Sequence, residues 1–163
     1  MVPQICGNQT MKKVVSTPED AVAFFRAALP KEQKEERVFV LPLDAHGKVL
    51  AKPILVSVGS EDGTTVIDAG AIFREALKAG AEEIIVAHNH PSGDPAPSKA
   101  DIAATKELRA LASQLGVPLV DHIIMGSSRP ASSAEFVSLA ESGRLDGICM
   151  KSKSVNIKGG SKR

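Results

Sequence analysis

The amino-acid sequence predicts an α/β protein in which helices cover a mixed β-sheet. Segments with helical periodicity alternate with short apolar segments of strand length, in the order helix, strands, helix, strand, helix, strand. The 163 residues suffice for one domain with a buried core, and 43% of them are hydrophobic. We therefore expect one folded domain at residues 16–147, after an N-terminal extension at 1–15 and before a basic, disordered tail at 148–163.

The first helix is predicted to begin after Thr17. A threonine side chain can cap a helix, Pro18 suits the first helical position, and the acids Glu19 and Asp20 favour the positive end of the helix dipole. An apolar segment follows, and Pro30 is expected to lie near the helix end.

A β-hairpin is predicted next. Val38–Leu43 has the composition of a strand, residues 44–47 form a turn, and Val49–Val58 is the expected returning strand, weakened at Pro53. Pro42 inside the first of these strands suggests a sheet edge or a bulge, because proline cannot donate a ladder hydrogen bond.

The second helix is expected at Ala69–Ala79, capped by Asp68 and ended by Gly80 in the left-handed conformation. A short buried strand is expected at Glu83–Ala87, and the following loop at His88–Pro97 carries three prolines.

A third helix is predicted at Lys99–Leu115 and is ended by Gly116. Its predicted apolar face consists of Ala104, Leu108, Leu111, Ala112 and Leu115. Two more strands are expected, at Val117–Met125 and at Phe136–Leu139.

The most informative motif is H-x-H, then seven residues, then S-x-x-D, formed by His88, His90, Ser98 and Asp101. Residues two apart on an extended backbone point to the same side, so both imidazoles can reach one ion. Two histidines and a carboxylate, with one position left for water, are what a catalytic zinc ion needs.

Simpler explanations exist for both halves of this motif. A lone H-x-H is more often a pair of exposed or hydrogen-bonded histidines. Ser98 and Asp101 also have the spacing of a capping box at the start of the third helix. The two roles of Asp101 are compatible, because a side chain in the first helical turn can point back toward the loop.

Hydrolysis at such a site also needs a general base. Spacing alone does not select it, and the candidates at strand edges or in loops are Glu35, Glu36, Glu61 and Asp94.

Composition excludes several other classes. The formal net charge is +1, and aromatic residues make up 3%, so neither a global basic field nor stacking platforms favour nucleic-acid binding. No apolar segment approaches the roughly 18 residues of a membrane span, so no membrane partner is expected. Cys6 and Cys149 lack metal-finger spacing and are expected to be reduced thiols of a cytoplasmic protein.

The charge is unevenly distributed. Residues 147–163 contain five bases and no acid, which leaves 15 bases and 19 acids in the remainder. The basic tail could make weak phosphate contacts with DNA, although such tails more often keep a protein in solution.

The motif and the residues around it resemble a known family. H-x-H-x7-S-x-x-D is the signature of the JAMM (MPN+) metalloprotease domain, and "AHNHPSGDPAPSKADIAATKEL" followed by "LGVPLVDHIIMG" resembles the RadC branch over Glu36 to Gly143. The resemblance implies a cytidine-deaminase-like α/β/α sandwich with one catalytic zinc ion, Zn²⁺. It implies His88, His90 and Asp101 as the metal ligands.

The resemblance also implies catalytic roles. JAMM proteins use a glutamate on an early strand to activate water, and the position before the "VFVLPLD" segment selects Glu36, with Glu35 as the competing residue. Ser98 matches the serine that stabilises the oxyanion, or it only caps the helix. His122 is expected near the site as a supporting group rather than as a ligand.

The function implied is that of a zinc-dependent metallohydrolase, a peptidase or isopeptidase acting on a protein, a peptide or a small conjugate. The alternative is a DNA repair or recombination accessory protein of the RadC family without proteolysis, and a third possibility is a metal-stabilised interaction module. In full-length RadC proteins a segment that resembles a helix-hairpin-helix module is joined to the JAMM domain, and this sequence does not match that module.

Overall fold

The computed structural model describes residues 14–60, 65–126 and 136–143. Most of the expected N-terminal extension and the whole expected basic tail lie outside these residues. The described elements follow the predicted order and are α1 (Pro18–Ala28), β1 (Arg37–Leu43), β2 (Ile54–Val58), α2 (Ala69–Lys78), β3 (Glu83–Asn89), α3 (Lys99–Leu115), β4 (Leu119–Met125) and β5 (Phe136–Ser138).

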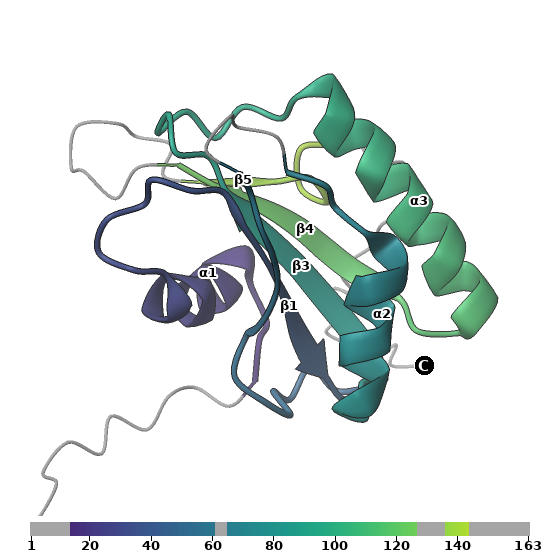
Figure 1. Ribbon diagram of the computed structural model, residues 1–163. Helices are drawn as coiled ribbons and strands as arrows, with labels where there is room; N and C mark the ends of the chain where they lie inside the picture. Colours follow the sequence, from purple (N-terminus) through teal and green to yellow (C-terminus); the bar gives the residue numbers. More distant parts are fainter. Residues whose placement is uncertain (1–13, 61–64, 127–135, 144–163) are drawn as a thin grey trace, which may run out of the picture.

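The strands form one mixed sheet in the order β2-β1-β3-β4-β5. β3 and β4 are parallel, and the other neighbouring pairs are antiparallel. Helix α1 covers one face, and α2 and α3 cover the other (Figure 1). The predicted α/β/α sandwich with a mixed central sheet is therefore confirmed.

The alternation of side chains along the strands gives the sheet two separate cores. The core under α2 and α3 includes Val38, Val40, Ile84, Val86, Phe73 and Leu108. The core under α1 includes Phe39, Leu41, Ile85, Ala87, Ile123 and Phe25. A position in β1 or β3 therefore fixes which helical layer its side chain meets, and this decides where polar residues of the same strands point.

The predicted helix ends are confirmed by their hydrogen bonds. The Thr17 side chain accepts from the Asp20 N–H, and the Asp68 side chain accepts from the Ala71 N–H at 3.0 Å. Gly116 has φ +66°, a left-handed conformation that favours glycine and ends α3.

The hairpin differs from its prediction in length. The returning strand was expected to begin at Val49, but β2 begins at Ile54, and Val49 forms only an isolated bridge with Leu43. Pro53 directly before β2 has no N–H to donate, which explains why regular pairing starts after it.

The expectation that Pro42 marks an edge or a bulge is wrong. β1 lies inside the sheet between β2 and β3, and the bulge lies at Val38/Phe39 instead. The Pro42 carbonyl accepts from the Leu50 N–H at 3.0 Å, on the side where β2 no longer pairs. Because N–H and C=O of one residue point to the same side of an antiparallel strand, the missing N–H costs no bond to β3.

The buried face of α3 is also shifted from its prediction. Its buried side chains are Asp101, Thr105, Leu108 and Ala112, whereas Leu115 in the last turn is 43% exposed. The face therefore begins with two polar residues, which an apolar pattern cannot reveal.

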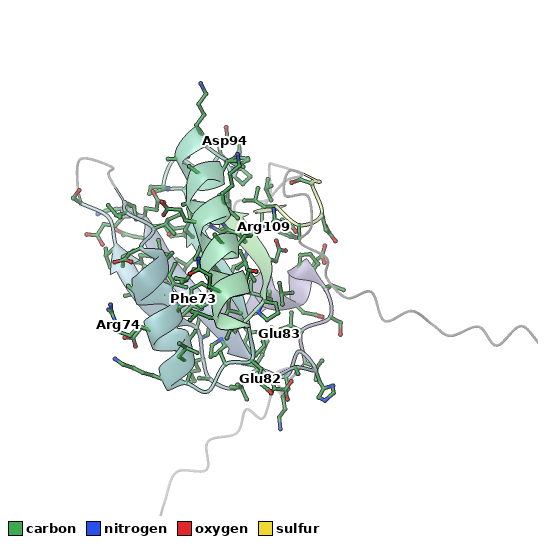
Figure 2. The ribbon with its side chains drawn as sticks, turned by 90° about the vertical axis from the view of Figure 1, so that its right-hand side faces the viewer. Phe73, Arg74, Glu82, Glu83, Asp94 and Arg109 are labelled. Carbon is green, nitrogen blue, oxygen red and sulfur yellow. The ribbon has the colours of Figure 1, made fainter. Side chains whose placement is uncertain are left out.

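The residues of the predicted site gather where the start of β1 meets the ends of β3 and β4. The start of β1 lies beside the end of β3, with Val38 opposite His88, and the end of β3 lies beside the end of β4. In Figure 2 the loop residue Asp94 lies at one end of the molecule and Glu82 and Glu83 at the other. Among the described helices, none has the length and apolar character that crossing a bilayer requires.

Candidate metal centre

Four side chains converge at this end of the sheet and are here called the metal-site group: Glu36, His88, His90 and Asp101. Each offers one nitrogen or oxygen atom, and these atoms lie within 4.8 Å of one another. His88 Nε2 is 3.1 Å from His90 Nε2 and 3.2 Å from Asp101 Oδ1, and His90 Nε2 is 3.1 Å from Asp101 Oδ2. Glu36 Oε1 lies 3.7 Å from His88 Nε2.

Strand alternation places Glu36 and His88 together. His88 pairs with Val38 across β1 and β3, and Glu36 stands two residues before Val38, so its side chain is on the same face. His90 follows the end of β3, and its N–H bonds the Met125 carbonyl at 2.9 Å. That bond fixes the start of the loop against the end of β4.

Asp101 occupies the third position of α3 in a capping box. Its Oδ2 accepts from the Ser98 N–H at 2.9 Å, and the Asp101 N–H donates to Ser98 Oγ at 3.1 Å. The same carboxylate faces both histidines. The capping role and the position in the metal-site group are thus combined in one side chain.

The ring of His90 is oriented by the loop that follows it. His90 Nδ1 lies 2.8 Å from the Asp94 carbonyl oxygen, which can only accept, so Nδ1 carries the proton of the neutral ring. Nε2 then presents its lone pair to the metal-site group. The Asp94 carboxylate accepts from the Ala96 N–H at 2.9 Å, within its own turn.

The group attracts positive charge. Burial opposes ionisation of Asp101, but hydrogen bonds from His88 and His90, donated when their Nε2 atoms are protonated, hold the pKa of this carboxyl well below its usual value. The hydrogen bond to Asp101 raises the pKa of His90, against the effect of partial burial. A cation bound among these atoms would likewise stabilise the ionised carboxylate of Asp101.

Zinc fits this donor set. Two ligands of a tetrahedral zinc ion, each about 2.0–2.1 Å from it, lie roughly 3.3–3.4 Å apart. The separations of 3.1 and 3.2 Å from His88 Nε2 to His90 Nε2 and to Asp101 Oδ1 are close to that value. Imidazole nitrogens and a carboxylate oxygen are ordinary zinc ligands.

The two competing glutamates have different surroundings. Glu35 Oε2 pairs with the Arg37 guanidinium at 3.0 Å, and its side chain is 42% exposed. Glu36 is 17% exposed and belongs to the metal-site group. The remaining candidate, Glu61, lies outside the described residues.

Asn89 holds the backbone on both sides of Glu36, a role that the sequence reasoning missed. The fully buried Asn89 accepts from the Arg37 N–H at 2.8 Å through Oδ1 and donates to the Glu35 carbonyl at 3.1 Å through Nδ2. One side chain thereby continues the pairing of β1 with β3.

His122 lies behind His88 and is fully buried. Its Nε2 is 2.9 Å from His88 Nδ1, and its Nδ1 is 2.7 Å from Thr105 Oγ1. Burial lowers the pKa of His122 well below its usual value, and the neighbouring His88 adds to the effect. Thr105 was missed from the sequence, although its position four residues after Asp101 on α3 was a usable signal.

A second polar cluster, here called the Asp121 clamp, consists of Asp121, Ser138 and the Ala140 N–H. The Ser138 hydroxyl donates to Asp121 Oδ2 at 2.6 Å, and the Ala140 N–H donates to Oδ1 at 3.1 Å. Burial raises the pKa of Asp121 to about 6 despite these bonds. The clamp fastens β5 and the following turn to β4.

Gly126 permits a close approach of the metal-site loop to the end of β4. A Cβ at this position would lie 2.5 Å from the Gly93 carbonyl oxygen and 2.9 Å from Pro95 Cδ. No larger residue fits there unless the loop moves.

Comparison with known proteins confirms the family that the H-x-H-x7-S-x-x-D motif indicates. The family described as RadC-like JAB domain matches residues 15–144. A UPF0758 protein of Coprothermobacter proteolyticus is 39% identical over 132 residues, covering 78% of this chain and 55% of the relative. A UPF0758 protein of Nostoc sp. is 40% identical over 126 residues, covering 76% and 51%. The chain thus spans about half the length of the curated relatives it matches.

Proposed function

We propose, from the premise that this chain belongs to the RadC-like JAB domain family, that it is a zinc-dependent hydrolase of peptide or isopeptide bonds. The observation that carries the proposal is the convergence of Glu36, His88, His90 and Asp101, whose ligand atoms lie within 4.8 Å of one another. Three of these side chains supply a zinc site, and the fourth is placed to move a proton.

The proposed roles follow from position. A bound zinc ion polarises a carbonyl group and lowers the pKa of a water molecule to near 7. Glu36, at the rim of the group, takes a proton from the attacking water. It returns that proton to the amine nitrogen as the C–N bond breaks, which leaves a carboxylate and an amine as products.

Ser98 is proposed to donate its hydroxyl hydrogen to the developing oxyanion. Its Oγ already accepts from the Asp101 N–H, and accepting that bond leaves the hydroxyl hydrogen for another partner. The side chain is exposed at the start of α3, beside a member of the metal-site group.

The substrate of the whole protein is proposed only by class: a protein, a peptide or a small conjugate that carries an amide bond. The alternative of a DNA repair accessory role depends on the basic residues of the tail, which lie outside the described part of the chain. No contact among the described residues favours it.

The metal site is tested by elemental mass spectrometry. Wild type and His88→Ala are purified side by side without chelators or a histidine tag. We expect about one zinc ion per wild-type chain and almost none in the variant, because each protein ligand contributes several kcal/mol to zinc binding. A wild type that takes up no zinc even when it is added would contradict the proposal.

The base is tested with Glu36→Gln and its matched neighbour Glu35→Gln. Glu36→Gln should retain zinc and lose at least about 100-fold in turnover, the usual effect of removing a general base. Glu35→Gln removes the same charge from a side chain paired with Arg37 and should retain both. Turnover is followed by mass spectrometry on peptide and lysine-isopeptide libraries, and full activity in Glu36→Gln would reassign the base.

A further inference from the structure

A buried chain of hydrogen bonds connects His88 with the backbone of Asp101. The Thr105 hydroxyl lies 2.6 Å from the Asp101 carbonyl oxygen and 2.7 Å from His122 Nδ1. His122 Nε2 in turn lies 2.9 Å from His88 Nδ1. Thr105, His122 and His88 are all 0% exposed, so water does not compete for these bonds.

Which atom donates and which accepts in each of these hydrogen bonds follows from the number of protons available, beginning at Thr105. A hydroxyl has one hydrogen, and a backbone carbonyl can only accept, so Thr105 donates to Asp101. Toward His122 the Thr105 oxygen must then accept. His122 therefore carries a proton on Nδ1.

The same counting extends to the metal-site group. A fully buried His122 is neutral, because a charged imidazolium would lose its hydration without a counter-charge in contact. With its single proton on Nδ1, its Nε2 accepts, and His88 must donate from Nδ1. When the ring of His88 carries only this proton, Nε2 has a lone pair, and Nε2 is the atom that faces His90 and Asp101.

We propose that Thr105 and His122 are positioning residues which hold His88 in the tautomer that binds a divalent metal ion through Nε2. The inference rests on the metal site of the proposed function. Because the chain of bonds ends on the backbone of Asp101, it also links the proposed ligands His88 and Asp101 through the buried side chains of Thr105 on α3 and His122 on β4.

The decisive variant is Thr105→Val, which preserves shape and removes the hydroxyl. His122 then has no acceptor at Nδ1 and is free to carry its proton on Nε2 and donate to His88. His88 in turn would carry its proton on Nε2, where the metal binds. We expect zinc affinity, measured by competition with a chromophoric chelator, to fall about 10- to 100-fold, as for other partners of metal-binding histidines.

Two further variants separate this effect from a general loss of packing. Thr105→Ser keeps the hydroxyl and should restore wild-type affinity. Ile123→Val removes one buried methyl group on the α1 side of the sheet and should lower stability without changing affinity. An equal loss of affinity in Ile123→Val, or no recovery in Thr105→Ser, would overturn the assignment.

The tautomer itself is measured in metal-free protein at pH 8, from the ¹⁵N chemical shifts of the imidazole rings. The wild type should have the proton of both His88 and His122 on Nδ1, and Thr105→Val should move it to Nε2 in both. A wild-type His88 protonated on Nε2, or a Thr105→Val spectrum without change, would refute the inference. If the wild type takes up no zinc, the proposed function fails, whereas these spectra still test the hydrogen-bond chain.

Discussion

The metal-site group and the Asp121 clamp are both polar, both at least partly buried and both built around an aspartate. They differ in how the hydrogen-bond donors and acceptors are matched. In the clamp each carboxylate oxygen of Asp121 receives a donor, one from Ser138 and one from Ala140. In the metal-site group two imidazole Nε2 atoms and the Asp101 carboxylate face one another at 3.1–3.2 Å.

The difference is one between closed and open hydrogen bonding. A polar cluster whose acceptors all have donors is satisfied by the protein alone and holds elements together. A cluster with more acceptors than donors attracts a proton or a metal ion. Three predictions test this distinction.

The largest effect is expected from exchanging the two aspartates for asparagine. Asp101→Asn should weaken zinc binding by roughly 1,000-fold or more, because it removes a charged ligand. Asp121→Asn, the matched change in the clamp, should leave affinity within about threefold, because Asp121 interacts with Ser138, Ala140 and the backbone of His122 and not with the side chain of a proposed ligand. Chelator competition measures both, and similar losses in the two variants would abolish the distinction.

The second effect is a pH dependence that belongs to the clamp. The pKa of Asp121 is about 6 in the folded protein and about 3.9 in an unfolded chain, so the folded state holds the proton more tightly. The contribution of Asp121 to stability is therefore greatest at low pH and is lost as the pH rises through 6, by roughly 2–3 kcal/mol in total.

Urea unfolding at pH 4.5 and 7.5 with chelator present checks this sign. The change in unfolding free energy between the two pH values is compared between wild type and Asp121→Asn, so that the contributions of other groups cancel. We expect the wild type to lose more stability than the variant as the pH rises. An equal change in both proteins would show that Asp121 is ionised throughout.

The smallest effect concerns the loop that supports His90. Gly126→Ala would push the loop away and displace the Asp94 carbonyl that orients His90. We expect about tenfold weaker zinc binding, the lower end of the usual effect of such partners. Gly116→Ala is the control, because a Cβ at Gly116 meets nothing within 4 Å and only φ +66° is strained, so this change should cost about 1–2 kcal/mol of stability without changing affinity.

Much of the fold and the centre of the site could be predicted from local pattern. The spacing of His88 and His90 places both imidazoles at one strand end, and the capping sequence at Ser98 fixes where α3 begins. These features depend on residues close in sequence, whose geometry follows from strand alternation and helix capping.

The supporting residues could not be predicted in the same way. Asn89 finds its partners 52 and 54 residues away, and His122 meets His88 across 34 residues. Pro42 shows the same limit, because its neighbours across the sheet decide whether the missing N–H matters. Pairing between distant strands supplies this information, and composition or periodicity does not.

The antiparallel course of β1 has a practical consequence. The strand starts beside the metal-site group and carries the chain to the opposite end of the sheet, where Glu82 supports the turn by accepting from the Ala45 N–H at 3.0 Å. His46 in that turn is exposed. A dye or a solid support attached at residue 46 would therefore leave the end of the sheet that carries the metal-site group open to large molecules, which makes this turn a suitable attachment point for binding experiments.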